Sequence, residues 1–164
     1  MGSGLSRVFT VRISVIMALA LLCAPISGFA RQSAPPNDQA QSIDAEAFRI
    51  QAEMHHSLAL HYLKSGDVDR ALAEARQIIQ PPIPPKLEVA VANSMSIITD
   101  QLKDLKRFDI AQTLLDETFK ATVQLPVRVM ILQNRARLYL LSGENDKAIE
   151  AWKRAKDLEA RIRN

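Results

Sequence analysis

The sequence predicts an all-α fold, a short α-solenoid of about three helix-turn-helix pairs, and three observations support it. From Ser42 to the C-terminus, large apolar residues recur at spacings of three and four, without strict alternation. Glycine-containing turns and prolines divide this region into segments of helical length. A pattern that spans one such turn occurs three times. Because one helix pair cannot bury its own apolar face, we expect stacked pairs to share a core.

Residues 1–30 have the pattern of a secretory signal peptide. Two arginines and no acidic residue accompany the apolar run Ile13–Ala24, and small residues lead from Gly28 to Ala30. Cleavage after Ala30 would make the mature protein periplasmic or secreted. The alternative is an uncleaved anchor that holds the chain in the inner membrane, facing the periplasm. A membrane span needs about 20 apolar residues, and Pro25 and Gly28 interrupt this stretch.

Charge and cysteine content exclude several classes of protein. The chain of 164 residues carries 21 basic and 18 acidic side chains, and without Arg7 and Arg12 the balance becomes 19 to 18. No block of five basic residues follows the signal, so a nucleic-acid partner is not expected. Cys23 is the only cysteine, which excludes a disulfide framework and a cysteine-based metal cage. Cleavage after Ala30 would leave no thiol, as suits an oxidising compartment.

A polar, proline-containing linker at residues 31–43 precedes the helical domain, residues 44–164, and we expect it to be disordered. Six helices are predicted within the domain. Their expected ranges are Asp44–Lys64, Val68–Gln80, Lys86–Leu105, Phe108–Ala121, Pro126–Leu141 and Asn145–Arg161.

Local signals set these helix boundaries. Gly66 can adopt the positive φ found at a helix end, and Asp67 can cap the helix that follows. The run Pro81–Pro85 must end the second helix, because proline has no amide hydrogen to donate. Pro126 fits the first turn of the fifth helix. Ser142, Gly143 and Glu144 form the last predicted turn.

The turns belong to a repeated pattern. Tyr62–Leu72 aligns without a gap with Tyr139–Ile149, and most of the paired residues are identical or conservative. Leu102–Gln112 keeps the same frame, with Lys106 in place of the glycine. The alanines of the second helices, at positions 71, 111 and 148, are 40 and 37 residues apart. This pattern resembles the tetratricopeptide repeat, a helix-turn-helix unit of 34 residues.

The resemblance covers residues from about Ala52 to the C-terminus. The residues that match the large, small and aromatic positions of the family are His55, Leu58, Ala59, Tyr62, Ala71 and Ala75 in the first unit, Met95, Ile98, Thr99, Leu102, Ala111 and Leu115 in the second, and Leu132, Arg135, Ala136, Tyr139, Ala148 and Trp152 in the third. Two features depart from the family. The repeats exceed 34 residues, and Arg135 stands where a large apolar residue is usual.

No catalytic, metal or cofactor motif is found in the sequence. His55, His56 and His61 share one predicted helix, but their spacings of one, five and six do not place two metal ligands on one face. Packing or solvent exposure accounts for them. No glycine-rich phosphate loop and no nucleophile motif occur. We therefore expect a protein that is not an enzyme and that binds no cofactor.

In the family, the first helices of successive pairs line a concave groove that receives a segment of a partner protein. The resemblance therefore implies a protein-protein interaction module or scaffold of the cell envelope. The alternative is a membrane-anchored assembly factor or chaperone of an envelope complex, in contact with the membrane only through an uncleaved N-terminal segment. The groove residues carried over by frame are His56, Leu60, Lys64, Asn93, Asp100, Met130, Gln133, Arg137 and Leu141.

Overall fold

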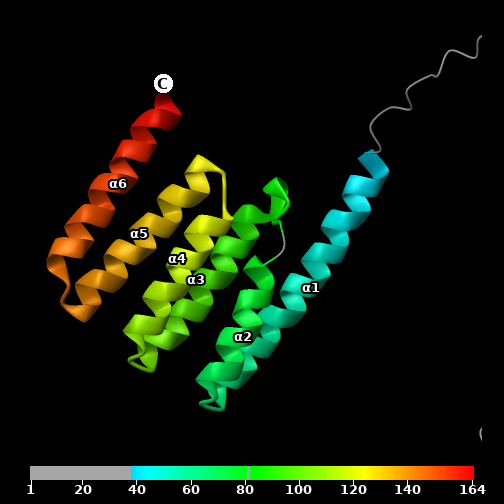
Figure 1. The fold of residues 1–164 in the computed structure, drawn as a ribbon, viewed down its shortest axis with the longest axis horizontal. Helices are drawn as coiled ribbons and strands as arrows, with labels where there is room; N and C mark the ends of the chain where they lie inside the picture. The colour runs from blue at the N-terminus through cyan, green and yellow to red at the C-terminus, as the bar shows by residue number, and fades with distance from the viewer. Residues whose placement is uncertain (1–37, 81) are drawn as a thin grey trace, which may run out of the picture. The chain divides into compact units, whose positions relative to one another are not determined.

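The computed structural model describes residues 38–80 and 82–164, and within this part of the chain every regular element is a helix. Figure 1 shows these helices following one another across the view in chain order, from α1 to α6. Their bounds are α1 Asp38–Lys64, α2 Val68–Ile79, the short 3-10 helix η1 Pro85–Leu87, α3 Glu88–Asp104, α4 Phe108–Ala121, α5 Leu125–Ser142 and α6 Asn145–Arg163. The predicted all-α class is confirmed.

The largest difference from the predicted boundaries lies at the start of α1. The helix begins at Asp38, so residues 38–43 are helical rather than part of a disordered linker. The sequence after Asn37 is rich in alanine and glutamine, which are good helix formers, and an acidic residue at position 38 suits a helix N-terminus. The predicted signal peptide and the rest of the linker lie outside the described residues.

Each helix packs mainly against its neighbour in sequence. The pairs are α1 with α2, α3 with α4, and α5 with α6, and α3 also contacts α1, α2 and α5. The first helices of the three pairs are thus spatial neighbours. One apolar cluster runs from Ala59 and Leu63 in α1 to Ile131 and Leu138 in α5, and smaller clusters join α5 to α6. The core is therefore shared between pairs.

Alanines are among the most deeply buried residues of the first and last helix pairs. Ala59 of α1 and Ala71 of α2 are both buried in the large cluster, and Ala136 and Ala148 occupy the same places in the last pair. A side chain of one carbon lets two helix backbones approach closely, and larger neighbours such as Ile78 and Met95 then fill the remaining space. This agrees with the small positions predicted from the sequence.

The three turns within the pairs share one backbone conformation. At the end of α1, in the turn that leads to α2, the N–H of Gly66 donates to the carbonyl of Leu63 (3.1 Å) and the N–H of Asp67 donates to the carbonyl of Tyr62 (2.9 Å). Lys106 and Arg107 repeat these bonds after α3, and Gly143 and Glu144 repeat them after α5. This paired arrangement is a Schellman motif, which needs a left-handed residue at its centre.

Lys106 takes the left-handed position that glycine fills in the other two turns. Its φ is 60°, against 79° for Gly66 and 82° for Gly143. A side chain at positive φ is strained, because Cβ approaches the backbone. The middle turn keeps the shape of the other two although its sequence lacks the glycine.

A buried carboxylate joins the second pair to the third. Glu88, at the start of α3, is 1% exposed. Its carboxylate accepts hydrogen bonds from the backbone N–H groups of Val123 (3.1 Å) and Gln124 (2.9 Å). These residues form the connection that leads into α5, where Pro126 lies in the first turn as predicted. Glu88 therefore satisfies two backbone donors that no helix can satisfy.

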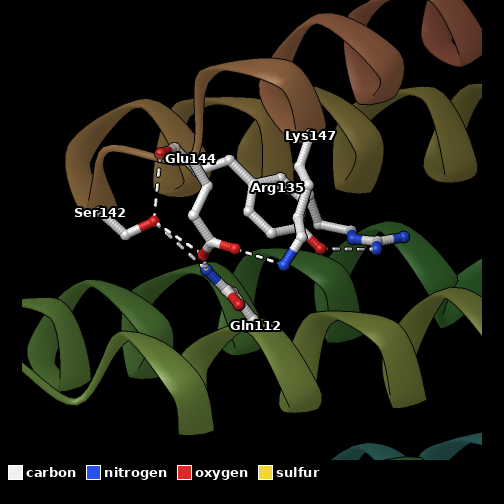
Figure 2. A network of polar contacts seen from close by, with 6 residues as sticks. Gln112, Arg135, Ser142, Glu144 and Lys147 are labelled. Atoms are coloured by element: carbon white, nitrogen blue, oxygen red, sulfur yellow. Dashed lines mark hydrogen bonds and ion pairs between the residues drawn. The ribbon is translucent and has the colours of Figure 1, made fainter.

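A polar network joins the same two pairs at the opposite ends of their helices. Figure 2 shows Glu144 accepting hydrogen bonds from Gln112 of α4 (2.7 Å) and from Ser142 of α5 (3.1 Å). Glu144 also pairs with Lys147. The bond from Lys147, and after it that from Gln112, lowers the pKa of the Glu144 carboxyl. The turn between α5 and α6 is thus fixed to the preceding pair.

We predict that Lys106→Gly stabilises the protein by about 0.5–1 kcal/mol, because it removes the strain at positive φ. The reciprocal change, Gly143→Lys, should destabilise by a similar amount, since the space around that Cβ is open and only backbone strain is added. Chemical denaturation of both variants measures the two effects. A Lys106→Gly variant less stable than the wild type would contradict the assignment of the turn.

Candidate interaction surface

Helices α3 and α5 each carry large apolar side chains that the described part of the fold leaves uncovered. Along α3, Met95, Ile98 and Leu102 point into the core, whereas Val89 and Ile97 are about half exposed. Along α5, Leu140 is 50% and Leu141 61% exposed. The helical period explains this division, because residues on opposite sides of a helix cannot enter the same core. An apolar surface of this kind is where a partner gains most from binding.

A small hollow lies between α3 and α5 on this surface. Its volume is about 100 Å³, and it brings together three of the predicted groove residues, Asp100, Arg137 and Leu141. The remaining lining residues are Ser96, Thr99, Lys103, Leu115, Asn134 and Leu138. The amide of Asn134 donates to the hydroxyl of Ser96 (3.0 Å), so the two helices are joined across its floor.

Of the charged side chains that line the hollow, Lys103 and Asp100 bind each other, whereas Arg137 forms no ion pair with the described residues. The Lys103 ammonium donates to the Asp100 carboxylate at 2.9 Å, and this bond raises the pKa of Lys103. Arg137 has no ion pair with any of the residues the structure describes and is exposed. A guanidinium beside an exposed leucine can receive a carboxylate or a backbone carbonyl of a ligand whose apolar side chain covers Leu141.

The three groove residues predicted on α1 do not reach this hollow. Leu60 is half buried and packs on the main core, and Lys64 lies exposed in the last turn of α1. His56 is half buried, and its buried Nδ1 has no hydrogen-bond partner within residues 38–80 and 82–164. Burial lowers the pKa of His56. The predicted groove residues of α1 therefore lie apart from the hollow between α3 and α5.

Two of the groove residues predicted on α5, Met130 and Gln133, contact other parts of the domain. Met130 is half buried and packs against the main cluster, and the amide of Gln133 donates to Glu159 of α6 at 2.9 Å. Asn93 of α3 is exposed, as the groove interpretation requires. Val89, Ile97 and Leu140 were missing from the predicted groove. Their signal in the sequence is an apolar residue at a solvent-facing helical position, next to Asn93, Asp100 and Arg137.

A wider hollow lies on the second helices, where no site was predicted. It has a volume of about 740 Å³ and lies between α2 and α4. Arg76 of α2 and Glu117 of α4 bridge it through two hydrogen bonds of 2.9 and 2.8 Å. The lining residues are Ala73, Arg76, Gln77, Ile79, Gln80, Glu117, Lys120 and Ala121. Arg76 and Glu117 already bind each other, so neither charge is free to bind a ligand in this hollow.

Arg135, where the predicted repeat frame expects an apolar residue, binds two groups at once. Its guanidinium pairs with Asp116 at 2.7 Å and donates to the hydroxyl of Tyr139 at 3.1 Å, the latter bond being drawn in Figure 2. The side chain is mostly buried between α4 and α5. A charged residue is tolerated there because its charge is paired and hydrogen-bonded.

No group of three or more potential metal ligands occurs among the residues that the structure describes. His55 is 2.6 Å from the Glu74 carboxylate, which links α1 to α2. His55 and His56 therefore do not share a ligand: His55 contacts Glu74, and His56 is half buried. Within residues 38–80 and 82–164, no helix is long and apolar enough to cross a membrane.

No family model matches the chain, and no curated protein or solved structure matches it either.

We predict that His56 makes the protein less stable in weak acid. The unfolded chain keeps the ordinary histidine pKa near 6.5, whereas burial lowers it in the folded protein. The stability is therefore complete above that value and declines as the pH falls through it, because protonation favours the unfolded state. Between about pH 7.5 and 5.5, the melting temperature should fall less in His56→Gln than in the wild type. His61→Gln, which changes an exposed histidine of the same helix, should keep the wild-type loss; an unchanged loss in His56→Gln would contradict the prediction.

Proposed function

We propose that the chain is a non-catalytic interaction module built from three tetratricopeptide-like helix pairs, and that its first helices bind a segment of a partner protein. Three turns of identical hydrogen bonding support the repeat assignment. The contacts of α3 with both α1 and α5 support a stack in which the first helices share one side. Such an arrangement has the layout of a short solenoid, whose neighbouring pairs complete each other's core.

The observation that carries the binding role is the exposure of Leu141 beside the hollow between α3 and α5. A leucine with 61% of its surface in water gains free energy when a partner covers it. Arg137 and Asn134 supply polar groups at the same place, and such groups orient a bound chain. An extended segment with an apolar residue next to an acceptor group suits this combination. The partner would be another protein rather than a nucleic acid.

We place this module in the cell envelope because of the predicted signal at residues 1–30, which lies outside the described residues. A cleaved signal would give a periplasmic or secreted scaffold. An uncleaved one would give an anchored assembly factor or chaperone of an envelope complex. N-terminal sequencing of the protein that accumulates in the cell distinguishes the two, because cleavage after Ala30 gives a chain that begins at Arg31.

We predict that a photoreactive phenylalanine analogue placed at position 141 forms a discrete cross-linked adduct in cells that express the chain naturally. The same analogue at position 149 should form none, although Ile149 has a similar exposure of 52%. Arg137→Glu should weaken the adduct at position 141 at least several-fold while the melting temperature stays near that of the wild type, because this exposed side chain contributes little to folding.

Equal labelling from positions 141 and 149, or no adduct from either, would contradict the proposed surface. Met130 is less suited to this test than Leu141. Met130 packs against the core, so a charged substitution there would unfold the domain as well as change its surface.

A further inference from the structure

Positively charged side chains lie against three aromatic rings in the described part of the chain. Measured from the guanidinium carbon or the ammonium nitrogen to the ring centroid, the contacts are Arg70 on Tyr62 (5.6 Å), Arg135 and Lys147 on Tyr139 (5.7 Å each), and Arg128 and Arg154 on Phe119 (5.0 and 5.7 Å). The face of an aromatic ring attracts a cation but has no net charge. A counter-charge must therefore come from an anionic group.

The rings of Tyr62 and Tyr139 differ from that of Phe119 in this counter-charge. Each cation on a tyrosine ring also binds a carboxylate. The ion pairs are Arg70 with Asp67 (3.0 Å), Arg135 with Asp116 (2.7 Å), and Lys147 with Glu144. Neither arginine on Phe119 has an ion pair with any residue of the described ranges. Two positive charges thus lie on one ring without a negative one.

The two arginines come from different helices and are held to different degrees. Arg128 of α5 is half buried, and its Nε donates to the carbonyl of Thr122, a fully buried residue, at 2.8 Å. This bond and the ring hold the guanidinium in place while its two terminal amino groups stay available. Arg154 of α6 is exposed. Its guanidinium can therefore turn towards a group that Arg128 already holds.

The acidic side chains nearest in sequence leave both charges unmatched. Asp116, one turn before the ring on α4, is already bound by Arg135. Glu150 and Asp157 lie about one turn before and after Arg154 on α6, and both are exposed and outside ion-pair distance of every described cation. Like charges held on one ring repel each other, and an anion that binds both relieves this repulsion.

From the missing counter-charge we infer that Arg128 and Arg154 bind a phosphate group beside Phe119. One guanidinium presents a planar fork of donors, which a single planar carboxylate already matches. A phosphate has oxygens in several directions, so it can accept from two forks that come from two helices. Soluble phosphate and the headgroup of an anionic lipid share this chemistry. The site uses no residue of the hollow between α3 and α5, so it does not rest on the proposed function.

Calorimetric titration of the full chain with inorganic phosphate, at constant ionic strength, tests the site. We expect saturable binding by the wild type. Arg154→Gln should raise the dissociation constant at least about tenfold, because it removes a charge-assisted bond. The melting temperature of this variant without phosphate should stay near the wild-type value, since the side chain is exposed. Arg128→Lys keeps the charge but removes the fork, so it should weaken binding as well.

Two matched variants control for the loss of a positive charge. Arg70→Gln removes an arginine from a ring where a carboxylate already neutralises it. Lys153→Gln removes the exposed cation next to Arg154 on α6. Both should bind phosphate as tightly as the wild type does. Absence of saturable binding by the wild type would overturn the inference, and so would an equal loss of affinity in Arg154→Gln and either control.

Sedimentation with lipid vesicles identifies the source of the phosphate. Vesicles of phosphatidylcholine with about 30% phosphatidylglycerol carry phosphate in an anionic headgroup. The readout is the difference between the wild type and Arg154→Gln, because both chains carry the same N-terminal segment. Weaker sedimentation of Arg154→Gln would assign the site to a lipid headgroup. Equal sedimentation, together with the expected calorimetric result, would assign it to a soluble phosphate.

Discussion

The close approach of helices at alanine is the constraint on which the rest of this structure depends. The buried residues include Ala59 and Ala71 in the first pair and Ala136 and Ala148 in the last. A side chain of one carbon lets two helices approach closely, and larger residues such as Ile78 and Met95 then fill the shared cluster.

Two polar contacts then join the second pair to the third, one at each end of their helices. The buried Glu88 carboxylate satisfies backbone groups ahead of α5, and the Glu144 carboxylate holds the turn ahead of α6 against α4. Such contacts have direction, whereas apolar burial has none.

The helices could be predicted from the sequence because their signals are local. The spacing of apolar residues, Gly66, Asp67 and Gly143 set boundaries that agree closely with those observed. Asp67 caps α2 as expected, through a bond of 3.2 Å to the N–H of Arg70. The turn at Lys106 was placed by its repeat frame alone, and its positive φ shows that the surrounding hydrogen bonds impose the conformation on a residue that disfavours it.

The surface was harder to predict because exposure depends on neighbours that are distant in sequence. The repeat frame placed Gln133 and Met130 in the groove, but Glu159 of α6 binds the first and the core covers part of the second. The sequence around a residue does not show how much of its side chain a neighbouring helix will bury. For the same reason the sequence could not show that Asp116 of α4 pairs with Arg135, whose charge lies where the predicted repeat frame expects an apolar residue.

The most direct test of the central claim compares two alanines of α2 by chemical denaturation. Ala71 is fully buried in the main apolar cluster, whereas Ala73 is exposed two residues later. Ala71→Trp should lower the free energy of unfolding by about 1–3 kcal/mol or more, because the helices must separate to admit the ring. Ala73→Trp should change it by about 0.5 kcal/mol or less. Equal stability of Ala71→Trp and the wild type would contradict the account of close helix packing.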